Sequence, residues 1–150
     1  MDSYEKWNEN RTKIPAGRYR LRCTGAKQVN FWLEGRGGWG IGQKVLLIFQ
    51  VIDGDYIDSV VPMFFPLPLN GKFGQGSKYY RCWCIANGLR KPIRTRLKEM
   101  PFSKFQNKVF TGDVVDVKPR WKNGVEEQPE LFHYSRVDCL YELEVGDPNN

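Results

Sequence analysis

The sequence predicts a mainly β domain in which five strands are joined by loops and one helix lies between the third and the fourth strand. Three patterns support this fold class. Apolar and polar residues alternate strictly from position 18, residues 44–52 form an almost continuous apolar run, and apolar residues recur at helical spacing over 78–87. With 150 residues, of which 41% are hydrophobic, the chain has the size and composition of one globular domain.

The first predicted strand follows a turn at residues 14–17 and has two distinct faces. Tyr19, Leu21 and Cys23 make its apolar face, which we expect to be buried. Its other face is a row of three arginines, Arg18, Arg20 and Arg22. The outer face of an antiparallel strand is ordinarily polar, so this row is either a solvated surface or a contact surface for anions. Three arginines without an accompanying acid favour the contact surface.

Residues 29–40 combine closely spaced glycines with large side chains. Glycine disfavours regular structure, so we expect a loop here, and its bulky side chains suggest contact with a ligand. The candidate contact residues of this segment are Phe31, Trp32, Arg36 and Trp39. The alternative is that Trp32 and Trp39 fold back over one end of the core, because tryptophan is usually well buried.

A hairpin and then the helix are predicted in the middle of the chain. Residues 44–52 and 57–65 are the two strands, and Pro62 places the second strand at a sheet edge or at a bulge. After a long connection, Ser77 is expected to cap the helix, which ends before Gly88. The helix residues that we expect in the core are Tyr79, Tyr80 and Trp83.

The C-terminal third is again β, with one strand over residues 108–118 and another over 131–143. In the last strand the residues expected to point inward are Val137, Cys139, Tyr141 and Leu143. The complete order, β-β-β-α-β-β, is that of the OB-fold, a five-stranded Greek-key barrel. We therefore expect a closed OB-fold barrel over residues 14–145, preceded by a flexible arm over 1–13 and followed by a short tail over 146–150.

In an OB-fold the second and third strands, together with two loops, form the binding face. Transferred to this chain, the candidate nucleic-acid-binding residues are Arg18, Arg20, Arg22, Phe31, Trp32, Arg36, Trp39, Lys44, Phe64, Trp121 and Lys122. A second basic patch, which ranks below this groove, consists of Arg90, Lys91, Arg94, Arg96 and Lys98. Solvation beside the helix is the plainer interpretation of that patch.

Charge and aromatic content favour a polyanionic partner that also presents flat rings. The chain has 23 Lys and Arg against 17 Asp and Glu, which gives a formal net charge of +6, and 14% of its residues are aromatic. Phosphates attract the basic side chains, and unstacked bases gain about 1–3 kcal/mol each from an aromatic platform. The sequence therefore predicts binding of single-stranded nucleic acid, DNA before RNA, with little sequence preference.

Two short segments also resemble a known family. Residues 14–19 (IPAGRY) and residues 47–54 (LIFQVIDG) are similar to the strand and turn framework of OB-fold single-stranded DNA-binding proteins encoded by phages and mobile elements. This resemblance implies a protein that coats exposed single strands during replication, recombination or repair.

The sequence argues against an enzyme and against a metal or cofactor site. No nucleophile, base and stabilising group form a recognisable constellation. Cys82 and Cys84 are too close in sequence for the usual zinc pair, and His133 is the one histidine of the chain. We expect Cys23 and Cys139 to be reduced core residues of a cytoplasmic protein, because no segment has the character of a signal peptide or of a membrane span.

Other partners stay open at this point. RNA could replace DNA, since aromatic stacking hardly distinguishes the two sugars. The apolar loop over residues 66–69 (PLPL) could instead dock a protein, because an OB-fold does not fix a function. The sequence also leaves open whether the chain forms a homo-oligomer.

Overall fold

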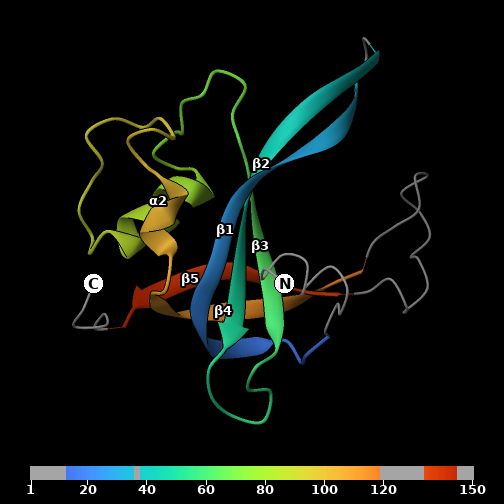
Figure 1. The fold of residues 1–150 in the computed structure, drawn as a ribbon, viewed down its shortest axis with the longest axis vertical. Helices are drawn as coiled ribbons and strands as arrows, with labels where there is room; N and C mark the ends of the chain where they lie inside the picture. The colour runs from blue at the N-terminus through green and yellow to red at the C-terminus, as the bar shows by residue number, and fades with distance from the viewer. Residues whose placement is uncertain (1–12, 36–37, 119–133, 145–150) are drawn as a thin grey trace.

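Within its described residues, the protein forms a five-stranded antiparallel sheet with one α-helix (Figure 1). This computed structural model describes residues 13–35, 38–118 and 134–144, with the backbone alone for 30–35 and 38–41. The sheet has the order β3-β2-β1-β4-β5. The elements in chain order are β1 (Gly17–Gly35), β2 (Gly38–Val51), β3 (Val60–Pro66), α2 (Lys78–Ala86), the 3-10 helix η1 (Phe102–Phe105), β4 (Val109–Val117) and β5 (Tyr134–Leu143).

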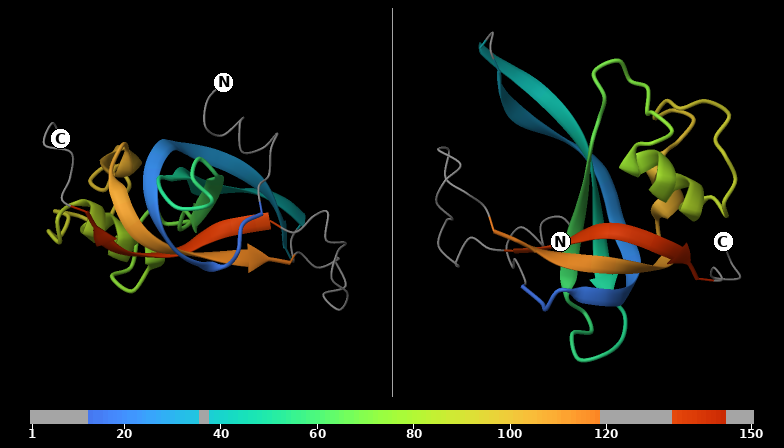
Figure 2. Two further views of the ribbon diagram at one scale, coloured as in Figure 1. Left: turned by 90° about the horizontal axis from the view of Figure 1, so that it is seen from below. Right: turned by 180° about the vertical axis from the view of Figure 1, so that it is seen from behind.

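The mainly β class, the five strands and the helix between the third and the fourth strand are confirmed. The closed barrel is wrong for the part of the chain that the structure describes, because β3 and β5 are the two edges of the sheet and do not pair. Cα atoms of β3 and β5 come within 8 Å of each other, so the sheet curls without closing (Figure 2). Pro62 in β3 has no N–H to donate, which leaves that edge short of a ladder donor.

The curl comes from β1, which serves two neighbours in turn. Its first part pairs with β4 from Gly17 to Arg22, and the rest pairs with β2 from Leu21 to Gly35. The register shifts between Cys23 and Gly25, where a bulge bends the strand. One long bent strand can therefore belong to both halves of the sheet.

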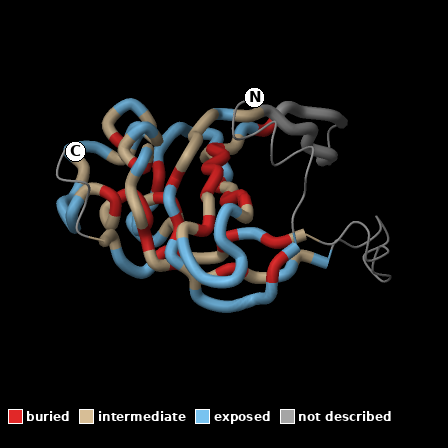
Figure 3. The backbone as a smooth tube through the Cα atoms, turned by 60° about the horizontal axis from the view of Figure 1, so that its bottom comes forward, coloured by how far each residue is buried: buried red, intermediate tan, exposed pale blue. Residues whose placement is uncertain are grey.

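The core lies between the curled sheet, α2 and η1 (Figure 3). Leu21 and Cys23 are fully buried, as the alternation of the first strand predicts. From the helix, the Tyr79 hydroxyl donates to the Met100 carbonyl at 2.6 Å, and Trp83 Nε1 donates to the Pro101 carbonyl at 3.1 Å. The expectation that Tyr79 and Trp83 close the core is confirmed, whereas Tyr80 is half-buried at its margin.

The ends of the helix also follow the prediction. The Ser77 hydroxyl accepts a hydrogen bond from the backbone N–H of Tyr80 at 3.2 Å, which is the geometry of an N-cap. Gly88 has a φ of 69°, the left-handed conformation that commonly follows a helix. Local capping thus sets both ends of the helix, which contacts the edge strand β5.

The segment over residues 29–40 is not the irregular loop that the glycines predict. β1 and β2 continue as a regular hairpin, with Phe31 opposite Gly42, Leu33 opposite Gly40 and Gly35 opposite Gly38. Gly40 and Gly42 thus lie across from large residues, where a missing side chain leaves room for its neighbour, while Gly35 and Gly38 lie opposite each other, and the ladder is kept. We call residues 31–35 and 38–42 the hairpin arm.

The start of the described chain is attached to the last strand. Ile14 is buried, its backbone N–H donates to Ser135 Oγ at 2.9 Å, and the Ser135 hydroxyl donates back to the Ile14 carbonyl at 3.2 Å. The predicted N-terminal arm lies outside the described residues apart from Lys13, and the predicted tail lies outside them altogether. Among the helices that are described, none has the length and hydropathy needed to cross a membrane.

Candidate nucleic-acid interface

The arginine row, Arg18, Arg20 and Arg22, lies on the exposed face of β1 as predicted, but two of its members already have acidic partners. Arg20 Nη1 lies 2.8 Å from Asp53 Oδ2, and its Nη2 donates to Glu144 Oε2 at 2.8 Å while its Nε bonds the other oxygen of Glu144. Arg20 thus forms a two-pronged ion pair with the Glu144 carboxylate and a third hydrogen bond with the Asp53 carboxylate. The hydrogen bond from Arg20 lowers the pKa of Glu144, so the pair is charged at neutral pH.

Arg18 is held in a second cluster, formed with Asp113 and Tyr141. Its Nε lies 3.4 Å from Asp113 Oδ1, and its guanidinium carbon lies 4.3 Å from the centre of the Tyr141 ring. The Tyr141 hydroxyl donates to the same carboxylate, and this bond raises the pKa of Tyr141 to about 12. Of the row, Arg22 alone has no acidic partner among the described residues.

Tyr141 is a correction to the sequence analysis, which placed it in the core. Its exposed fraction is 44%, and the neighbouring Leu140 is buried instead. The pairing of β4 with β5 shifts register twice, so that Asp138 and Tyr141 have no partner on β4. Each extra residue moves the side chains that follow it to the opposite face of the sheet, and simple alternation in the sequence does not predict this change.

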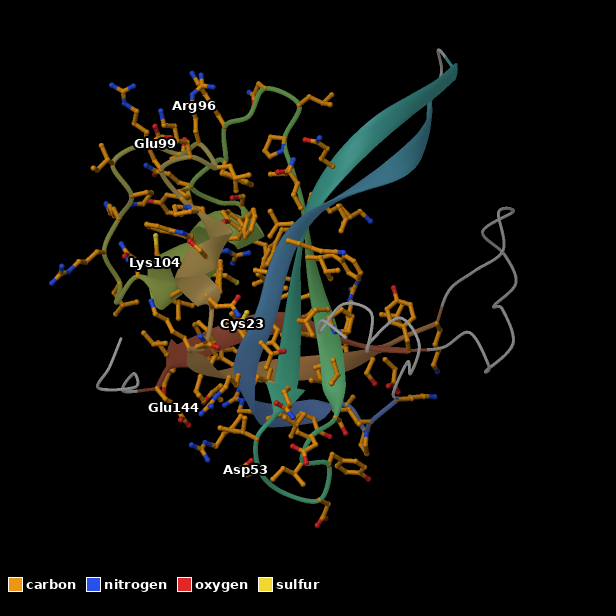
Figure 4. The ribbon with its side chains drawn as sticks, in the orientation of Figure 1. Cys23, Asp53, Arg96, Glu99, Lys104 and Glu144 are labelled. Atoms are coloured by element: carbon orange, nitrogen blue, oxygen red, sulfur yellow. The ribbon has the colours of Figure 1, made fainter. Side chains whose placement is uncertain are left out.

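The hairpin arm carries three of the predicted contact residues, Phe31, Trp32 and Trp39. Fourteen positions separate Arg18 from Trp32 on β1, which corresponds to about 46 Å of strand. In Figure 1 the arm extends from one end of the molecule, and Figure 4 labels Asp53 and Glu144, the partners of Arg20, at the other. The structure therefore does not bring the arginine row and the aromatic arm together.

Lys44 and Phe64 are brought together where the arm joins the sheet. Lys44 Nζ lies 5.4 Å from the centre of the Phe64 ring, and the two side chains come from the adjacent strands β2 and β3. A cation beside a ring at this place fits the predicted binding face. Of the other predicted residues, Arg36, Trp121 and Lys122 lie outside the described residues.

The second basic patch is different from the arginine row. All five of its basic side chains are exposed, and within the described part of the chain no carboxylate lies within 4.0 Å of any of them. We call residues 89–98 the basic loop. Figure 1 shows this loop and the hairpin arm in the same half of the molecule but on opposite sides of it, and Figure 2 also shows them on opposite sides.

The structure adds Lys72, which the sequence analysis missed, to the basic loop. Lys72 forms an isolated β-bridge with Arg96, and the backbone N–H of Phe73 donates to the Thr95 carbonyl at 2.7 Å. Twenty-three residues lie between the two bridged positions, and no spacing in the sequence signals the contact. The basic surface therefore contains residues from two separate segments, the basic loop and the connection between β3 and α2.

No protein-family model, no curated protein and no solved structure matches this chain. Its function is therefore inferred from the residues and their geometry alone.

Proposed function

We propose that the protein binds single-stranded nucleic acid, DNA in the first place, and coats it with little sequence preference. The hairpin arm contacts bases, and the exposed side chains of the basic loop contact phosphates. We propose that the curled sheet is a partly open OB-type barrel, a fold whose second and third strands and adjoining loops bind oligonucleotides. The helix between β3 and β4 and the long bent β1 agree with that fold.

The observation that carries the proposal is the pairing of the arm. Among the described residues, positions 31–35 and 38–42 pair with each other and with no third strand. A two-stranded ribbon has little burial to offer its side chains and is marginal in water without a partner surface. A phenylalanine and two tryptophans on such a ribbon are suited to stack on unpaired bases, which offer flat apolar faces.

Titration of labelled oligonucleotides tests the proposal. The probes are a fluorescein-labelled DNA of about 20 nucleotides, the RNA of the same sequence and the matching duplex, since OB-folds cover about 4–16 nucleotides each. We expect the single-stranded DNA to bind, to quench tryptophan fluorescence as bases stack, and to dissociate as salt rises. Tighter binding of RNA would assign the protein to RNA, and no binding of any strand would refute the proposal.

Docking of a protein is the second candidate function, and one observation favours it. Leu69, in the loop that follows β3, has an exposed fraction of 97%, and Pro68 beside it is half-buried. Exposed apolar side chains mark contact sites where they gather in a patch, and Leu69 follows the exposed Pro66 and the half-buried Leu67 and Pro68. Under this alternative, oligonucleotide titrations of the wild type give no signal, and Leu69→Ser weakens binding of the protein partner.

A further inference from the structure

Three basic side chains surround an open hollow where the basic loop meets the connection between β3 and α2. The hollow has a volume of about 390 Å³ and is lined by Lys72, Arg94, Thr95 and Arg96. Lys72 comes from the connection between β3 and α2, and the other three belong to the basic loop. The bridge between Lys72 and Arg96 and the bond from Phe73 to Thr95 hold the two segments together.

The charge in this hollow is not neutralised by neighbouring acids. Lys72, Arg94 and Arg96 are exposed, and no described carboxylate lies within 4.0 Å of their charged groups. Glu99 is the acid closest in sequence, and its backbone N–H donates to the Arg96 carbonyl at 3.0 Å. Figure 4 labels both residues, and Glu99 does not line the hollow. Three cations that face one space without a counter-ion are suited to an anion.

We infer that this hollow binds phosphodiester groups of the same single strand whose bases contact the hairpin arm. No aromatic ring lines it, so it offers nothing for bases to stack on. Its two guanidinium groups match the planar, two-pronged geometry of phosphate oxygens, and the Thr95 hydroxyl adds a donor. The inference rests on the proposed function, because the strand is the source of the phosphate.

The test is a triple variant, Lys72→Ala/Arg94→Ala/Arg96→Ala, titrated with the labelled DNA of about 20 nucleotides across a range of salt. On a single strand, the slope of log affinity against log salt falls by about 0.7 for each phosphate that the protein no longer neutralises. We therefore expect the slope to fall by about 2 in this variant. Extrapolated from 1 M, that difference corresponds to about a hundredfold weaker binding at 0.1 M salt.

A matched control removes the same charge elsewhere. Arg81→Ala/Lys104→Ala/Lys118→Ala also lowers the net charge by three, and none of these residues lines the hollow. We expect it to keep the slope of the wild type within about 0.7. Circular dichroism and thermal unfolding of both variants check that the fold is retained, which we expect because the replaced side chains lie outside the core.

Lipid headgroups also contain phosphate, and Ile93, which precedes Arg94 in the chain, has an exposed fraction of 94%. Flotation with vesicles of phosphatidylglycerol and of phosphatidylcholine separates this source. Loss of strand binding in the triple variant alone supports the inference. If the triple variant and its control have equal slopes, the inference is overturned while the proposed function stands. The inference is also overturned if the triple variant loses vesicle binding but keeps strand binding. A wild-type protein that binds no strand overturns both.

Discussion

The arginine row and the basic loop look alike in sequence and differ in structure. Each is a short segment with several arginines and no acidic residue within it. On β1, Arg18 and Arg20 are engaged by Asp113, Asp53 and Glu144. In the basic loop, Arg94 and Arg96 have no acidic partner among the described residues.

The difference has a physical origin in how each segment is placed. A strand in the middle of a sheet has neighbours on both sides, and their side chains lie within reach. Antiparallel pairing puts Asp113 of β4 opposite Arg18, and Glu144, just after β5, reaches Arg20 across β4. The basic loop lies outside the sheet, so no register delivers acids to it. Charge count alone thus overstates the affinity of the row for anions.

The largest expected effect concerns the hairpin arm, which in the proposed function binds the same strand as the basic loop. We expect Trp32→Ala/Trp39→Ala to weaken binding of single-stranded DNA by about 30-fold or more, since each stacking platform is worth about 1–3 kcal/mol. Fluorescence anisotropy measures the affinity. Trp32→Phe/Trp39→Phe retains the rings and should restore most of it. Unchanged affinity in a folded alanine variant would move base contacts away from the arm.

A smaller effect is expected when the row is released from its acids. Asp53→Asn/Glu144→Gln frees Arg20, which then resembles an arginine of the basic loop. We expect the salt dependence of DNA binding to steepen by about 0.7, the contribution of one added phosphate contact on a single strand. The control Asp55→Asn/Glu142→Gln makes the same change in net charge at exposed acids that do not pair with Arg20. Equal steepening in both variants would show an effect of net charge alone.

The smallest effect concerns stability and its dependence on pH. Arg20 lowers the pKa of Glu144 in the folded protein, so the pair contributes stability above the ordinary pKa of a glutamate, about 4.3. The contribution is lost as the pH falls through the lowered value. We expect the melting temperature of Glu144→Gln to be slightly below that of the wild type at neutral pH, because exposed pairs contribute little.

Once the pH is below the lowered pKa, Glu144 of the wild type is protonated and uncharged like the glutamine of the variant, so the two melting temperatures are expected to converge. Calorimetric scans at several pH values measure the difference. A gap that is constant with pH would contradict the role of this ion pair.

Sequence patterns predicted what depends on neighbours along the chain. Alternation identified the buried face with Leu21 and Cys23, and capping chemistry placed the helix after Ser77. Patterns failed where pairing between strands decides. Gly40 and Gly42 join a regular ladder because large residues lie opposite them, and the bulge at Tyr141 exposes a residue that alternation buries.

The candidate site divides in the same way. The exposure of the arginine row and of the basic loop followed from residue type and pattern. Which of these charges are paired could not be predicted from the sequence, because Glu144 is 124 positions from Arg20 and tertiary structure alone bridges Lys72 to Arg96. Which charges remain available to a ligand depends on contacts between distant segments.

A direct comparison of the two regions tests the central claim. Arg18→Ala/Arg20→Ala and Arg94→Ala/Arg96→Ala each remove two arginines at the same spacing and lower the net charge equally. The measurement is the slope of log affinity for single-stranded DNA against log salt. We predict that the slope falls by about 1.4 in the basic-loop variant and by less than about 0.7 in the row variant. A larger fall in the row variant would contradict the account.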